Sequence, residues 1–164
     1  MPRLLISVLL LCLAQWSWAQ TGTDIANVAR AELRTEKSAL MTEAMMLSDA
    51  QSEKFWPIYR EYENELDKIS DTRLSSLKKF AESYDSMTDK TADGLISNMF
   101  ALDEDRVKLR KKYYKKMKKA LDSVTAARFA QVDRQISTLV DLEIMQMVPL
   151  IATPEELGLG PAPA

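Results

Sequence analysis

The sequence contains no histidine, and its single cysteine, Cys12, lies in the apolar N-terminal stretch. Histidine and cysteine supply the commonest bases, nucleophiles and soft metal ligands, so their absence excludes the usual triads and dyads. Neither a glycine-rich phosphate loop nor a G-x-S-x-G sequence is present. We therefore predict that the protein is not an enzyme, with no catalytic, cofactor-binding or metal-binding residues and no cofactor.

Glycine is also scarce, with 4 in the whole chain. Only Gly94 lies outside the N-terminal junction and the C-terminal tail. Because glycine is the residue that most readily ends or weakens a helix, this distribution predicts long, uninterrupted helices.

The first residues have the composition of a cleaved export signal. Arg3 precedes an apolar run over residues 4–14, and the small residues Ser17 and Ala19 stand where a signal peptidase cuts. We expect cleavage after Ala19 and no stable membrane span afterwards, because the apolar run is too short to cross a bilayer comfortably. The mature chain would then contain no cysteine, and packing alone would stabilise it.

The next part of the chain predicts two helices. Good helix formers and a broken apolar stripe indicate a first helix over residues 23–46. Ser48 and Gln51 then form an S-x-x-Q capping box, in which each side chain bonds the other residue's backbone N–H. A long second helix is expected to begin there, with a bend rather than a break at Pro57.

Two further helices follow. Residues 86–89 supply a turn and a cap for the third helix. Asp122 and Ser123 end that helix and cap a fourth, which Pro149 ends. Because so few residues separate the second and third helices, we expect an antiparallel hairpin. A turn centred near Ser86 and Met87 would place Tyr113 near Arg60.

These patterns predict a domain organisation in three parts and an all-α fold. The signal occupies residues 1–19 and a single helical domain occupies residues 20–150. A flexible tail rich in proline and glycine occupies residues 151–164, which lack the apolar content to fold independently.

The segment Leu47-Ser48-Asp49-Ala50-Gln51 resembles the L-T-x-x-Q signature of the Spy/CpxP family of periplasmic proteins, with serine in place of threonine. In the family, the pattern occurs a second time near the start of the last helix. At that place this sequence has a degraded copy, residues 124–128, with arginine at the glutamine position. The residues of the two copies are Leu47, Ser48, Gln51, Val124, Thr125 and Arg128.

This resemblance implies a bent four-helix hairpin that forms a homodimer in the periplasm. Members similar to Spy bind unfolded or stress-damaged proteins without ATP, and members similar to CpxP also restrain an envelope sensor kinase. Some relatives bind zinc or nickel, which is disfavoured here because the sequence has no histidine. The resemblance therefore implies a chaperone-like protein and, as the alternative, an envelope-stress signalling adaptor that docks on a sensor kinase or another envelope partner.

The densest feature of the sequence is a basic run in the third helix, which also contains apolar residues. Such a surface would attract acidic, partly unfolded chains and then contact their apolar groups. Alternatively, the lysines only balance the acidic stretch 53–67 of the second helix in weak exposed ion pairs. DNA binding is a third use of a basic stripe, which export disfavours. The candidate residues are Lys108, Lys111, Lys112, Tyr113, Tyr114, Lys115, Lys116, Met117 and Lys119.

Methionines and aromatic residues add three more candidates. Met41 and Met45 share one helix face, and thioethers suit an adaptable binding surface, core packing or a Cu(I) site in a copper-stress protein. Trp56 lies among aromatic residues at helical spacing, which predicts either core or an exposed apolar patch.

Overall fold

The computed structural model describes residues 31–153 and 155–158, and every regular element in that part of the chain is helical. This confirms the all-α prediction. The predicted signal peptide, residues 1–19, and the start of the predicted first helix lie outside the described residues. The chain divides into two compact units, Met1–Ala44 and Met45–Ala164. Each unit is described by itself, and the single domain over residues 20–150 stays a prediction.

In the first unit, the described residues from 31 to 44 are helical, and the last residue of this helix is 45, the first residue of the second unit. Its side chains differ in exposure, since Met41 is buried while Leu33 and Leu40 remain partly exposed.

The second unit begins with α2 (Asp49–Ser83), and the predicted capping box starts this helix. The Ser48 hydroxyl accepts from the Gln51 backbone N–H at 3.4 Å, and the Gln51 side chain accepts from the Ser48 backbone N–H at 3.1 Å. Pro57 lies inside the helix, which continues past it. Proline removes one backbone hydrogen bond of the helix. The buried side chains of Phe55, Ile58 and Tyr59 on either side of it favour the helical arrangement through packing.

Three elements follow α2: the short 3-10 helix η1 (Tyr84–Ser86), α3 (Asp89–Ala120) and α4 (Ser123–Met147). Each of the two predicted segments, 86–89 and 122–123, contains the cap of the helix that follows it. The Thr88 side chain accepts from the Thr91 backbone N–H, and the Asp122 carboxylate accepts from the first backbone N–H groups of α4.

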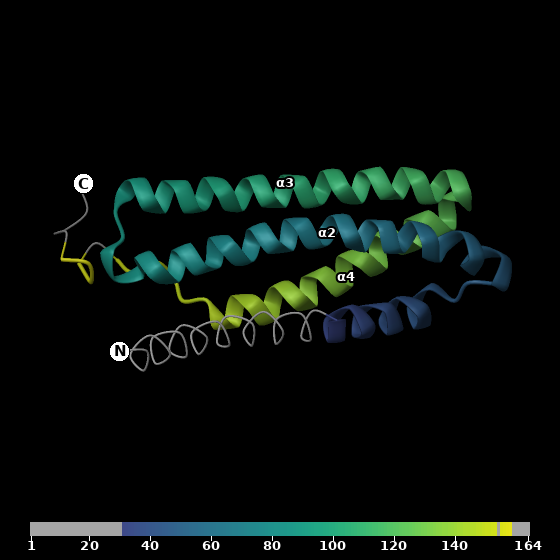
Figure 1. The fold of residues 1–164 in the computed structure, drawn as a ribbon, viewed down its shortest axis with the longest axis horizontal. Helices are drawn as coiled ribbons and strands as arrows, with labels where there is room; N and C mark the ends of the chain where they lie inside the picture. Colours follow the sequence, from purple (N-terminus) through teal and green to yellow (C-terminus); the bar gives the residue numbers. More distant parts are fainter. Residues whose placement is uncertain (1–30, 154, 159–164) are drawn as a thin grey trace, which may run out of the picture. The chain divides into compact units, whose positions relative to one another are not determined.

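Figure 1 shows α2 and α3 side by side, and cross-helix contacts show that they run antiparallel. Glu61 contacts Lys116, and Glu65 contacts Lys112. The hydroxyl of Tyr113 also contacts Glu65, at 2.9 Å, about one helical turn from the register predicted by the turn alone. Side chains lean toward the N-terminus of their own helix, so those of α3 reach toward the turn and meet residues of α2 further along.

An aromatic core joins α2, α3 and α4 at the end of α2 that begins with the cap. Tyr62 lies edge-on to Tyr113 and to Phe129, with ring centroids 5.3 and 5.5 Å apart. Phe55 and Tyr59 stack on each other along α2 and also contact Phe129. Burying side chains of this size contributes roughly 2 kcal/mol each, so this cluster is the main source of stability of the second unit.

The rest of the α2–α3 pair is much less packed. Among the described residues between Glu65 and Leu102, Met87 is the one with a buried apolar side chain. We call residues 66–101 the tip. Here the two helices are linked by contacts such as the hydrogen bond from Asn98 to Ser76, 2.5 Å long.

Candidate functional site

The basic run predicted from the sequence, residues 108–119, lies on the second half of α3 and has two different faces. It contains eight cations, which include Arg110 and Lys118. Leu109, Tyr113 and Met117 are buried, so this face of the run belongs to the core. Tyr113 and Met117, which the sequence offered as partner contacts, therefore point inward. Tyr114 is half-buried, and all six lysines of the run from Lys108 to Lys119 that were candidates remain exposed.

Two lysines of the run pair with the acidic stretch of α2, as the alternative interpretation predicted. Lys112 contacts both carboxylate oxygens of Glu65 at 2.7 Å, and Lys116 contacts Glu61. The hydrogen bonds from Lys112 and Tyr113 lower the pKa of the Glu65 carboxyl. Both lysines also lie over the ring of Tyr113, 5.2 and 5.7 Å from its centroid.

Two more cations of the run have partners elsewhere. Lys108 pairs with Glu104 and Asp105 of its own helix at 3.3 and 3.2 Å. Arg110 instead points toward α4 and donates to Asp133. Exposed lysine pairs of this kind contribute little to stability, whereas the arginine contact is largely shielded from water.

The remaining four cations of the run have no carboxylate partner within the described part of the chain: Lys111, Lys115, Lys118 and Lys119. All four are exposed. We call these four residues the free lysines. Because α2 neutralises only their neighbours, the free lysines give α3 a local positive charge even though the chain carries a net charge of −2.

Exposed apolar side chains lie on the same helix, on the turns that precede the free lysines. Ile96, Phe100 and Val107 are 39%, 59% and 41% exposed. Spacings of four and seven residues place them on one side of α3. A single exposed apolar residue needs no explanation, but a row of three beside unneutralised cations is a candidate contact surface.

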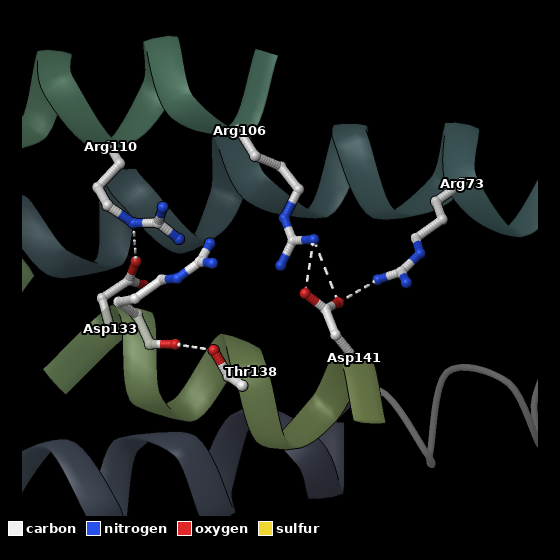
Figure 2. Close-up of polar contacts among 7 residues, drawn as sticks. Arg73, Arg106, Arg110, Asp133, Thr138 and Asp141 are labelled. Atoms are coloured by element: carbon white, nitrogen blue, oxygen red, sulfur yellow. Dashed lines mark hydrogen bonds and ion pairs between the residues drawn. The ribbon is translucent and has the colours of Figure 1, made fainter. Parts of the chain in front are cut away.

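The arginines of α2 and α3 that face α4 bind two of its aspartates (Figure 2). Asp133 is almost fully buried, and it accepts from Arg110 Nε at 2.6 Å and from the Tyr62 hydroxyl at 2.7 Å. Burial and the neighbouring Asp133 carboxylate raise the pKa of Tyr62, which holds this tyrosine in its neutral, donating form. Three helices are thus joined at one carboxylate.

Asp141 joins the same three helices two turns further along α4. Arg73 of α2 donates to it at 2.5 Å, and Arg106 of α3 donates to both of its oxygens at 3.1 and 3.0 Å (Figure 2). Burial alone would raise the pKa of Asp141, but the hydrogen bonds from the two arginines outweigh it and lower the pKa below its ordinary value.

Sequence reasoning missed both aspartates. An available signal was the spacing of four residues from Phe129 to Asp133, which places Asp133 on the apolar face of α4. A carboxylate on the apolar face of a helix predicts a cationic partner, because a buried charge needs one. The sequence does not say which of the many arginines and lysines supplies it.

The two signature copies lie in contact with each other. The side-chain amide of Gln51 donates to the Thr125 hydroxyl at 3.2 Å, and that hydroxyl donates to Asp122 at 2.7 Å. Asp122 also accepts from the Thr125 backbone N–H, and these bonds lower its pKa. We call Ser48, Gln51, Asp122 and Thr125 the cap clasp, since it fastens the start of α4 to the start of α2. The arrangement links the first turns of the two helices.

The other signature residues lie at the edge of the cap clasp. Leu47 is half-buried and Val124 is largely exposed. Arg128, at the position where the family has glutamine, donates to the thioether of Met46 at 3.7 Å. Met46 has a φ of 51°, in the left-handed region that follows many helix ends.

The remaining candidates are mostly packed. Met41 and Met45 are 1% and 3% exposed, so neither thioether is open to solvent. Trp56 is half-buried and lies edge-on to Phe55 and Tyr59. Among residues 31–153 and 155–158, no three acidic side chains gather closely enough to hold a metal ion.

None of the helices in the described ranges is both long and apolar enough to cross a membrane. Comparison of the chain with protein-family models, with curated proteins and with solved structures gave no match. The resemblance to the Spy/CpxP family therefore stays a prediction, and the function is proposed from the surface of α3.

Proposed function

We propose that this is an exported, ATP-independent, chaperone-like protein that binds unfolded or stress-damaged proteins in the periplasm. The observation that carries the proposal is the adjacency, on α3, of the free lysines and the exposed residues Ile96, Phe100 and Val107. We further propose the bent four-helix hairpin and the homodimer that the family resemblance implies.

Unfolded proteins differ from folded ones in exposing apolar side chains and unpaired acidic segments together. Unneutralised lysines raise the encounter rate with acidic chains through long-range attraction, which salt screens. The apolar row then holds exposed aromatic and aliphatic groups through short-range burial. Both interactions are non-directional, which suits many clients and needs no nucleotide hydrolysis.

Suppression of aggregation tests this proposal. In a light-scattering assay with several unrelated unfolding clients, this protein should reduce the scattering when it is present at about the same molar concentration as the client. Replacement of three free lysines (K111Q, K115Q and K119Q) should weaken suppression of acidic clients several-fold, because the cationic attraction is lost. A matched triple variant, K78Q, K79Q and K90Q, removes the same charge from exposed lysines elsewhere and should leave suppression unchanged.

The same assay distinguishes the signalling adaptor. An adaptor holds one partner at a defined interface, so it would leave the scattering of unrelated clients unchanged. Equal suppression by the two triple variants would separately refute the role given to the free lysines.

A further inference from the structure

The charges of α3 are divided between its two halves. Residues 89–105 contain five carboxylates and one lysine, whereas residues 106–120 contain nine cations and no carboxylate. Carboxylates of α2 and α4 pair with four of these cations, namely Arg106, Arg110, Lys112 and Lys116. Within the part of the chain that the structure describes, the free lysines are left to carry the positive charge of this half.

The free lysines lie on one side of the helix. Lys111, Lys115 and Lys118 are four and three residues apart, and Lys119 lies one turn beyond Lys115, so all four share a face. At 1.5 Å per residue they extend over about 12 Å of the helix. The buried side chains of the same segment lie on the opposite side, against the core. The free lysines therefore form a ridge that points away from the core.

The helix itself does not account for this ridge. Its dipole favours cations in the last turn, where Lys118 and Lys119 lie, but the effect does not reach back to Lys111 and Lys115. Like charges four residues apart also destabilise a helix slightly, and Lys115 has such a neighbour on each side. An anionic partner against the ridge would remove this repulsion.

The shape and composition of the ridge favour an extended, uniformly charged partner. Small ligands are bound in concave sites, whereas the outer side of a single helix is convex. Within the segment 108–119 the apolar side chains are buried and Tyr114 is half-buried, so the ridge lacks the apolar centre of a defined protein interface. A flat surface with many negative charges, in contrast, can contact all four lysines at once.

We propose that the free lysines dock the protein on the surface of a bilayer that contains anionic phospholipid. The basic half of α3 lies against the headgroups, and the acidic half is directed away from them by repulsion. Lysines near such a surface contribute to binding through their charge. This partner is additional to the unfolded clients proposed above, and docking requires no client.

Nucleic acid also presents many phosphates, but two observations favour the bilayer. The free cations are all lysines, which bind phosphate as point charges, whereas readout of bases relies mainly on arginine. The export that the sequence predicts would also place the chain beside a membrane and away from the genome.

Sedimentation with vesicles tests the docking. An equimolar mixture of phosphatidylcholine and phosphatidylglycerol should bind the protein, and phosphatidylcholine alone should not, because the charge of the lipid supplies the attraction. Binding should weaken as salt is raised above about 0.1 M, where screening limits the attraction to about 10 Å.

The triple variant K111Q/K115Q/K119Q should bind the mixed vesicles about a hundredfold more weakly, because each lysine near an anionic surface contributes about fivefold. The matched control K78Q/K79Q/K90Q removes the same charge from exposed lysines of the tip and should bind as the wild-type protein does. Circular dichroism verifies that both variants fold. An equal loss of binding in the two variants would overturn the docking, since net charge alone would then explain the attraction.

A fluorophore at either end of the α2–α3 pair tests the orientation. The predicted mature chain has no cysteine, so S123C and S86C each create a single position for labelling. Both serines are exposed. Ser123 follows the basic half of α3, and Ser86 precedes the acidic half. Energy transfer to labelled lipid headgroups should be several-fold stronger from position 123, and equal transfer from both positions would contradict the orientation.

Docking and client binding can fail independently. The vesicle assay contains no unfolded protein, so a lack of binding to the mixed vesicles would overturn the docking and leave the proposed function to the light-scattering assay. Tighter binding to duplex DNA than to the mixed vesicles would overturn the choice of partner.

Discussion

At the scale of single residues, Asp133 has the most demanding environment in the second unit. Its carboxylate is nearly inaccessible to water, and it is bonded by Arg110 and by the Tyr62 hydroxyl. A buried charge is tolerated only when its partners replace its hydration, and both partners do so here at short distances. Removing the charge leaves Arg110 shielded from water without a counter-ion.

Asp133→Asn should therefore lower the free energy of unfolding by about 3 kcal/mol. Tyr62→Phe removes one neutral donor and should cost only about 1 kcal/mol. Urea denaturation of both variants and of the double variant measures the two costs and their coupling. Additive costs would contradict a shared contact, since residues that bond each other are expected to couple.

The ion pairs of Asp141 should make the free energy of unfolding depend on pH. Its pKa is lowered in the folded protein by Arg73 and Arg106, so the ion pairs contribute stability above the ordinary aspartate pKa of about 3.9. That contribution disappears as pH falls through the lower, folded pKa. The stability difference between the wild-type protein and Asp141→Asn should be largest near neutral pH and should shrink below about pH 4.

Urea unfolding at pH 7, 5, 4 and 3 measures this difference. Glu143→Gln removes one exposed carboxylate from the same helix and controls for the change in net charge. A difference for Asp141→Asn that stays constant from pH 7 to pH 3 would contradict the assigned role of the arginines.

At the scale of elements, each of the three long helices of the second unit begins with a side-chain cap. Ser48, Thr88 and Asp122 all accept hydrogen bonds from backbone N–H groups of the first turn. Two of these caps also belong to the cap clasp, so one set of hydrogen bonds both starts two helices and fixes them together.

Ser48→Ala should destabilise the protein by about 1 kcal/mol, because α2 then loses the acceptor for its first turn. Asp122→Ala should cost about as much for α4. Thermal unfolding measures both effects. Ser123→Ala, which changes an exposed neighbour with no cap role, should stay within about 0.5 kcal/mol of the wild-type protein.

The elements of this fold are more predictable from sequence than their contacts. Helix starts are readable because capping depends on residues at most three positions apart: the sequence marked Ser48 itself, and it placed the other two caps within residues 86–89 and 122–123. The contacts of Asp133 and Asp141 join residues far apart in the sequence, and many cations were available to each. The contacts between Tyr62 and Tyr113 and between Ser76 and Asn98 lie within two positions of the register predicted for α2 and α3. The lysine contacts with Glu61 and Glu65 lie four positions away from it, because long side chains lean toward the N-terminus of their own helix.

The basic run was the most visible candidate, but its division into paired and free lysines could not be read from the sequence. Lys112 and Lys115 have the same chemistry and similar neighbours in the chain. What separates them is whether they face Glu65 across the α2–α3 contact, and that follows from the register.

At the scale of the whole second unit, the core is concentrated at one end of the α2–α3 pair. The aromatic cluster around Tyr62, Tyr113 and Phe129 lies beside the cap clasp, whereas the tip, residues 66–101, contains one buried apolar side chain. Stability within a protein follows such differences in packing.

Hydrogen exchange should reveal this gradient. Backbone amides of the tip should exchange through local opening well before those of 55–62, 109–117 and 126–136, which require global unfolding. Mass spectrometry of exchanged peptides measures the order. Uniform protection along α2 and α3 would contradict the uneven core.

The thinly packed tip also affects how the protein tolerates mutation. Phe100 and Ile96 contribute surface but little core, so replacing them costs the fold much less than replacing Phe55 or Phe129. Selection is then free to vary the tip while the aromatic end keeps the chain folded. Substitutions in the tip can therefore change the surface that it presents without compensating stabilisation elsewhere in the chain.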